Sequence, residues 1–112
     1  MKQTIAIPLE EDVLCSHFGH CQQFAIFYVE NDEIVDAKLL TPPPHEPGLL
    51  PGWLAERGID FVIAGGMGQR AIDLFKAQNI PVCVGAQIKD PKALVLDWLS
   101  KKLITGNNYC DH

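Results

Sequence analysis

The order of strand-like and helix-like segments predicts an α/β fold with three layers, in which helices cover the sheet. Residues 59–64 form a nearly continuous apolar run, which is typical of a strand buried on both faces. Two strand-like segments in the first half are separated by Asn31-Asp32, which indicates a hairpin turn. Strands alternate with helices in the second half, as they do in a parallel sheet. We therefore expect a hairpin attached to the edge of a parallel core.

Five segments have the composition of strands: residues 2–8, 23–30, 33–40, 59–64 and 81–84. The second of them is dense in β-branched and aromatic residues, which favour pleated structure. Residues 9–21 are polar and rich in Cys and His, and we interpret them as a functional loop. The prolines of residues 41–48 exclude a helix interior or a central strand there, so this segment is expected to be an extended connector.

Three helices are expected, over residues 49–57, over about residues 69–78 and from Pro91 onwards. The first carries an apolar stripe and is followed by Gly58, a residue that often ends helices. Asp90 before Pro91 is a typical helix start. Residues 1–104 are predicted to form one domain, and the polar residues 105–112 a flexible tail.

The net charge is −5, which argues against a nucleic-acid groove and against an anionic membrane surface. We find no apolar stretch of the ~18 to 20 residues that a membrane span needs. A signal peptide is not expected at the N-terminus, so the predicted location is the cytoplasm. Cysteines are more often thiols or metal ligands than disulfides there. Cys83, between two valines, is expected to be a buried core thiol.

The segment 15–21 contains four soft or borderline metal ligands: Cys15, His17, His20 and Cys21. Thiolates and imidazoles select zinc, copper(I), iron and iron–sulfur clusters over magnesium or calcium. The spacing differs from the paired C-x-x-C pattern of structural zinc sites. More ligands could come from His45, Cys110 and His112 in other segments. The alternative is that the histidines are surface residues and the cysteines incidental.

A glycine-rich turn follows the buried strand. Residues 66–71 formally match the dinucleotide-binding pattern G-x-G-x-x-G/A, although they lie halfway along the chain instead of opening the fold. Free backbone N–H groups at the start of the next helix could bind an anion, with Arg70 nearby. The alternative is a tight turn without a ligand.

Taken in order, these segments resemble the dinitrogenase iron–molybdenum cofactor-binding family over almost the whole chain. The resemblance depends on residues 5–8, 17–19, 24–29, 48–54, 60–68 and 70–71. It implies a ribonuclease-H-like α/β sandwich with a mixed five-stranded sheet. His17 matches the histidine of the family's H-F-G loop, and His45 lies where many members have a histidine. Gly65, Gly66 and Gly68 match the family's glycine turn. Cys15 and Cys21, which flank the H-F-G element, depart from the family pattern.

The resemblance implies a small non-catalytic protein that binds, carries or helps assemble an iron–sulfur or molybdenum–iron–sulfur cofactor. Its partners would be that metal–sulfur cofactor and a donor or acceptor protein in cluster assembly. A single iron or zinc ion is the alternative cargo. Two other classes stay open: a small redox or nucleotide-binding enzyme that uses the glycine turn, and a regulatory module that binds a partner protein.

Overall fold

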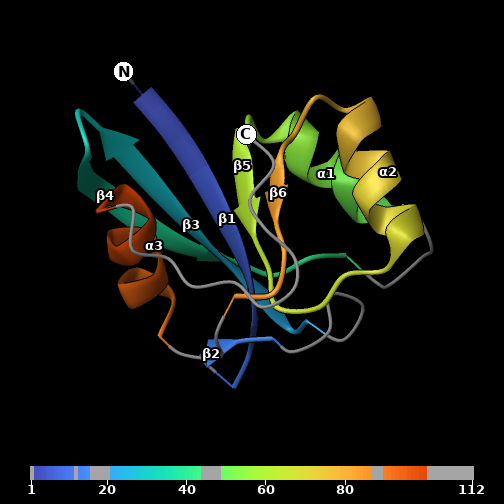
Figure 1. Ribbon diagram of the computed structural model, residues 1–112, viewed down its shortest axis with the longest axis horizontal. Coiled ribbons are helices and arrows are strands. Elements are labelled where there is room, and N and C mark those ends of the chain that lie inside the picture. The colour runs from blue at the N-terminus through green and yellow to red at the C-terminus, as the bar shows by residue number, and fades with distance from the viewer. Residues whose placement is uncertain (1, 12, 16–20, 44–48, 87–89, 101–112) are drawn as a thin grey trace.

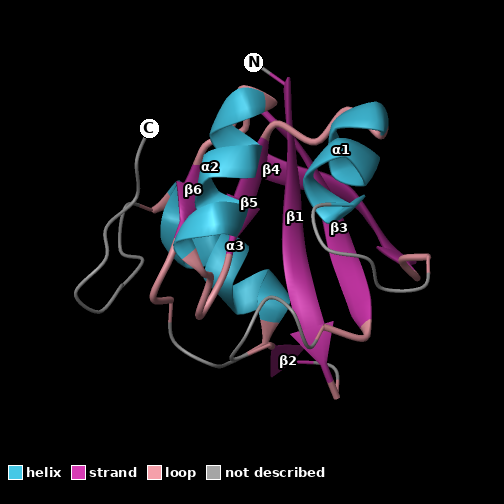
Figure 2. Ribbon diagram, turned by 90° about the vertical axis from the view of Figure 1, so that its right-hand side faces the viewer, coloured by secondary structure: helices cyan, strands magenta, loops and turns pink. Residues whose placement is uncertain are grey.

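A computed structural model describes residues 2–11, 13–15, 21–43, 49–86 and 90–100 of the chain. Its helices lie on both sides of one central sheet (Figures 1 and 2). The predicted three-layer α/β fold is thereby confirmed. The predicted tail at residues 105–112 lies outside the described residues. Among the residues that are described, no helix is long and apolar enough to cross a membrane.

The sheet is mixed, and the described residues contribute six strands to it, one more than predicted. They are β1 (Lys2–Glu10), β2 (Val13–Leu14), β3 (Gln23–Glu30), β4 (Glu33–Leu40), β5 (Phe61–Ile63) and β6 (Val82–Cys83). The spatial order is β4-β3-β1-β5-β6, with β2 paired to β1. The hairpin strands β3 and β4 are antiparallel, whereas β5 is parallel to both β1 and β6. The extra strand, β2, falls inside the segment that was expected to be a loop.

Alternation along β1 gives the sheet two apolar faces, because successive side chains of a strand point to opposite sides. Ile5 and Ile7 belong to a core cluster that also contains Leu94 and Val95 of α3 (Pro91–Leu99). Ala6, between them, belongs to a second cluster on the other face. That cluster includes residues of α1 (Leu49–Glu56) and α2 (Gln69–Ala77). Each face therefore has its own apolar core.

The helix boundaries follow the local signals in the sequence. The carboxylate of Asp90 accepts a hydrogen bond from the N–H of Ala93 at 3.2 Å, which caps the start of α3. After α1 the chain reverses at Gly58, whose φ of +73° lies in the left-handed region that glycine adopts without strain. Both predicted helix signals, the Asp-Pro start and the terminating glycine, are confirmed.

Candidate functional site

Two segments that carry candidate ligands meet at the carboxyl end of β1. The N–H of Cys15, directly after β2, donates to the C=O of Pro8 at 2.9 Å. The β1 residues Ile5 and Ala6, just before Pro8, pair with β5. The end of β5 therefore lies on the side of β1 to which β2 and Cys15 are bonded. The glycine turn begins just after β5. Figure 1 shows β2 and the ends of β5 and β6 together along the lower rim of the molecule.

Hydrogen bonds to β1 also fix both ends of the cysteine segment. Cys15 is held at Pro8, while Gln22, next to Cys21, donates its N–H to the C=O of Leu9 at 2.7 Å. β2 and β3 lie on opposite sides of β1, so the two cysteines lie on either side of its end. Cys15 is completely buried and Cys21 is half-buried. Neither forms a disulfide, so both sulfur atoms can act as ligands.

Burial changes the acidity of the Cys21 thiol. Loss of solvation and, to a smaller extent, charge on Cys15 together raise the pKa of Cys21 to about 11. Cys21 therefore keeps its proton at neutral pH. Because the thiolate is the form that binds metal, an incoming metal must displace that proton.

The glycine turn leads into the exposed N-terminus of α2. Gly68 is the N-cap residue, with φ −69° and ψ 157°, and among the described residues no side chain caps this end. A Cβ atom at Gly68 would have no heavy atom within 4 Å. Neither backbone conformation nor packing therefore requires glycine here, whereas its small size keeps the first N–H groups of α2 accessible. Arg70 lies in that first turn and is exposed.

The ends of β5 and β6 are joined just beyond the sheet. The N–H of Gly85 donates to the C=O of Gly65 at 2.6 Å, and that of Ala86 to the C=O of Ala64 at 3.1 Å. Gly85 has a φ of +88°, which explains its identity. This turn was not predicted, although a glycine after the apolar residues 82–84 was the available signal.

None of the predicted histidine and tail ligands falls in the part of the chain that the structure describes. His17, His20, His45, Cys110 and His112 lie outside the described residues. Within the described part of the chain, no group of three or more Cys, His, Asp or Glu residues is arranged to hold a metal ion. The predicted residues that do come to one end of the sheet are Cys15, Cys21 and the glycine turn with Arg70.

Cys83 departs from its predicted chemistry. It is completely buried in β6, as expected, but it is half of a disulfide and not a thiol. Its position between Val82 and Val84 predicts burial but contains no information about a distant sulfur partner. Since Cys15 and Cys21 remain thiols, this disulfide uses the sulfur atom of neither of them.

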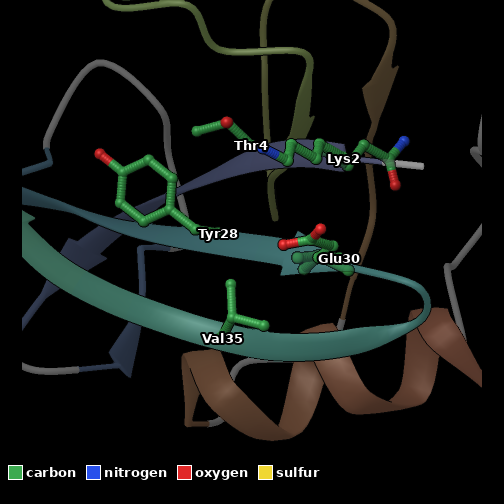
Figure 3. Close-up of a pocket in the computed structure, with 7 residues that line it drawn as sticks. Lys2, Thr4, Tyr28, Glu30 and Val35 are labelled. Atoms are coloured by element: carbon green, nitrogen blue, oxygen red, sulfur yellow. The ribbon is translucent and has the colours of Figure 1, made fainter.

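A separate hollow of about 220 Å³ lies at the other end of the sheet. Figure 3 shows its lining residues at the beginning of β1, the end of β3 and the beginning of β4, among them Lys2, Tyr28, Glu30 and Val35. Its lining contains no cysteine or histidine. It is therefore not the predicted metal site.

The model of the dinitrogenase iron-molybdenum cofactor family matches residues 1–101 of the chain. The chain belongs to this family. The dinitrogenase iron-molybdenum cofactor domain thus spans the described sheet and all three helices, and it makes the chain a small cofactor-related protein.

Individual proteins show similarity over most of the chain. The uncharacterised protein MJ0580 of Methanocaldococcus jannaschii is 31% identical over 83 residues, which is 70% of each chain. The crystal structure of PH0822 superposes with a TM-score of 0.88 at 26% identity, covering 94% of this chain and 96% of that one. The apo form of the orange protein from Desulfovibrio gigas gives a TM-score of 0.73 at 18% identity, covering 98% and 97%. That last similarity shows a shared fold.

Proposed function

We propose that the chain binds an iron–sulfur or molybdenum–iron–sulfur cluster and carries it to or from another protein, without catalysing a reaction. One observation supports this proposal most strongly. The thiols of Cys15 and Cys21 lie at the same end of the sheet as the glycine turn. Ligands of open α/β sheets bind outside the carboxyl ends of the strands. Family membership favours the same class of cargo.

The two parts of the site supply different chemistry. Thiolates are ligands for iron, and an anionic cluster is attracted to the N–H groups and the positive dipole end of α2. Arg70, in the first turn of α2, adds positive charge. Both thiols and the start of α2 thus favour a cargo that combines metal with negative charge.

Two cysteines leave any four-coordinate metal incompletely ligated. His17 and His20 lie between the cysteines in sequence, and His45 and His112 are further candidates. A donor or acceptor protein could fill the remaining positions during transfer. An incomplete shell suits a carrier, because its cargo must be released; a closed four-ligand site would instead suit a structural ion. A single iron or zinc ion is the simpler cargo that the same residues could hold.

Anaerobic reconstitution tests the proposal. The purified chain is incubated with iron and sulfide, with and without thiomolybdate, and bound metal is measured by elemental analysis and visible absorption. We expect a coloured, metal-loaded protein. The double variant Cys15→Ser/Cys21→Ser should lose the metal, whereas removal of residues 107–112 should only weaken binding. Circular dichroism establishes that each variant is folded. Full metal occupancy in a folded double variant would rule out the cysteine site.

A further inference from the structure

The hydrogen bonds of β1 determine which backbone groups of the sheet face outward. The C=O of Thr4 accepts from the N–H of Asp60, on the β5 side, and the C=O of Leu9 accepts from Gln22, on the β3 side. N–H and C=O of one residue in a strand point to the same side, and the side alternates along the strand. Odd-numbered residues of β1 therefore bond to β3, and even-numbered residues bond away from it.

The same alternation continues across β3 to β4. Ile5 of β1 lies opposite Phe27, so Phe27 bonds to β1 and the next residue, Tyr28, bonds to β4. Asp36 lies opposite Tyr28 and must bond back to β3. The N–H and C=O groups of Ala37 consequently point out from the edge of the sheet at which no further described strand pairs. Two residues further along β4, the same holds for Leu39.

This outer edge has the features of a surface that could pair with another strand. β4 has eight residues and lies at the end of the strand order. Val35 and Leu39 are 58% and 56% exposed. In an antiparallel pairing of two β4 strands with Ala37 on the two-fold axis, Asp36 would lie opposite Lys38 of the second copy, so opposite charges would meet. An edge with outward backbone groups and exposed apolar residues is a template for association.

Two local features counteract that tendency. The carboxylate of Asp36 accepts a hydrogen bond from the outward N–H of Ala37 at 2.8 Å. A register shift leaves Val35 unpaired, because Val29 lies opposite Ile34 while the preceding residue of β3 already faces Asp36. Figure 3 shows the side chain of Val35 directed towards the hollow that Tyr28 also lines. Bulges and charged groups at an edge are common ways to prevent pairing.

We propose that Asp36 prevents antiparallel pairing between the outer edge of β4 and the same edge of a second copy of this chain. Pairing at Ala37 requires its N–H to leave a charge-assisted hydrogen bond for a neutral one, which is weaker. The two-fold symmetry of the pair imposes this exchange on both copies at once. The ion pair gained between Asp36 and Lys38 would be exposed and therefore contributes little in compensation.

The test separates the hydrogen bond from the charge. Asp36→Ala removes both, whereas Asp36→Asn removes the charge and keeps a side-chain oxygen that can accept from Ala37. Asp73→Ala removes one exposed carboxylate from α2 and serves as the matched charge control. Analytical ultracentrifugation over a range of concentrations gives the dimer dissociation constant. We expect Asp36→Ala to lower it by at least about tenfold. Asp36→Asn should lower it less, because its neutral oxygen still accepts from Ala37 but without the charge, and Asp73→Ala should remain like the wild type.

Amide hydrogen exchange then locates the association. In Asp36→Ala the amides of Ala37 and Leu39 should become protected as the concentration rises, and adding Ala37→Pro, which removes the outward donor, should restore the monomer. Three results would overturn the proposal. The first is an Asp36→Ala variant that associates no more than the wild type. The second is an Asp36→Asn variant that associates as strongly as Asp36→Ala. The third is protection from exchange that does not include the amide of Ala37.

Discussion

Charge on Cys15 raises the pKa of Cys21, so the two sulfur atoms lie within electrostatic range of each other. Five residues separate them in sequence, and the end of β1 lies between them in the sheet. Two like charges this close repel each other, and burial adds a desolvation cost. A bound cation would remove both penalties, because it stabilises the thiolates directly.

The raised pKa makes a prediction about thiol reactivity. Burial raises the pKa of Cys21 to about 11, above the ordinary value for a cysteine, so its thiolate fraction at pH 8 is lower than that of an exposed cysteine. Alkylation of Cys21 by iodoacetamide at pH 8 should be at least about tenfold slower in the folded chain than in urea-unfolded chain. The rate should rise steadily towards pH 11. Mass spectrometry of the labelled peptide measures it, and equal rates in the two states would contradict the shift.

The same shift has a consequence for stability. Between pH 9 and pH 11 the unfolded chain loses the Cys21 proton while the folded chain keeps it. The free energy of unfolding should therefore fall as pH rises through this window and be unaffected by Cys21 below it. In urea titrations, Cys21→Ser should have a smaller alkaline loss of stability than the wild type. An identical pH dependence would show that Cys21 is not responsible.

A substitution at Gly68 can distinguish an effect on ligand binding from an effect on folding. Its φ and ψ are allowed for a β-branched residue, and a Cβ atom would meet open space. Gly68→Val should lower the free energy of unfolding by less than about 1 kcal/mol, through the poorer N-cap. It should also reduce the metal content after reconstitution, because the side chain covers the N–H groups of α2. Unchanged metal content in Gly68→Val would leave the turn a purely structural role.

At Gly58, in contrast to Gly68, the backbone conformation favours glycine. Its φ of +73° is strained for any residue with a Cβ atom, although no neighbour lies within 4 Å. Gly58→Ala should destabilise the chain by about 1 kcal/mol in urea unfolding. Gly68→Ala, at a φ of −69°, is the matched control and should change stability much less. Equal losses in the two variants would contradict the conformational explanation.

Local signals in the sequence predicted much of this fold. Composition and turn residues were sufficient for β3 and β4, whose bounds are the predicted ones, and the capping residue Asp90 marked the start of α3. The order of elements was sufficient for the α/β class. Strand order and the short strand β2 depend on pairing between distant segments, and a two-residue strand has no period of its own.

The candidate site was predicted less completely. Sequence spacing identified Cys15 and Cys21 as neighbours in one segment, but it did not show that β1 lies between them or that Cys15 is completely buried. Likewise, it identified the glycine turn without indicating that this turn and the cysteines share one end of the sheet. The position of β1 between the cysteines results from its pairing with β2 and β3, and the shared end results from its parallel pairing with β5. No local pattern specifies these pairings.

Paramagnetic NMR on the reconstituted chain tests the central claim, the position of the cluster, most directly. An iron-containing cluster broadens amide signals in its vicinity. If it binds at the carboxyl end of the parallel strands, the amide signals of Cys21 and Gly66 should broaden or disappear on loading. Those of Lys2 and Glu30, at the opposite end of the sheet, should stay sharp. Broadening at Lys2 and Glu30 with sharp signals at Cys21 and Gly66 would contradict the account.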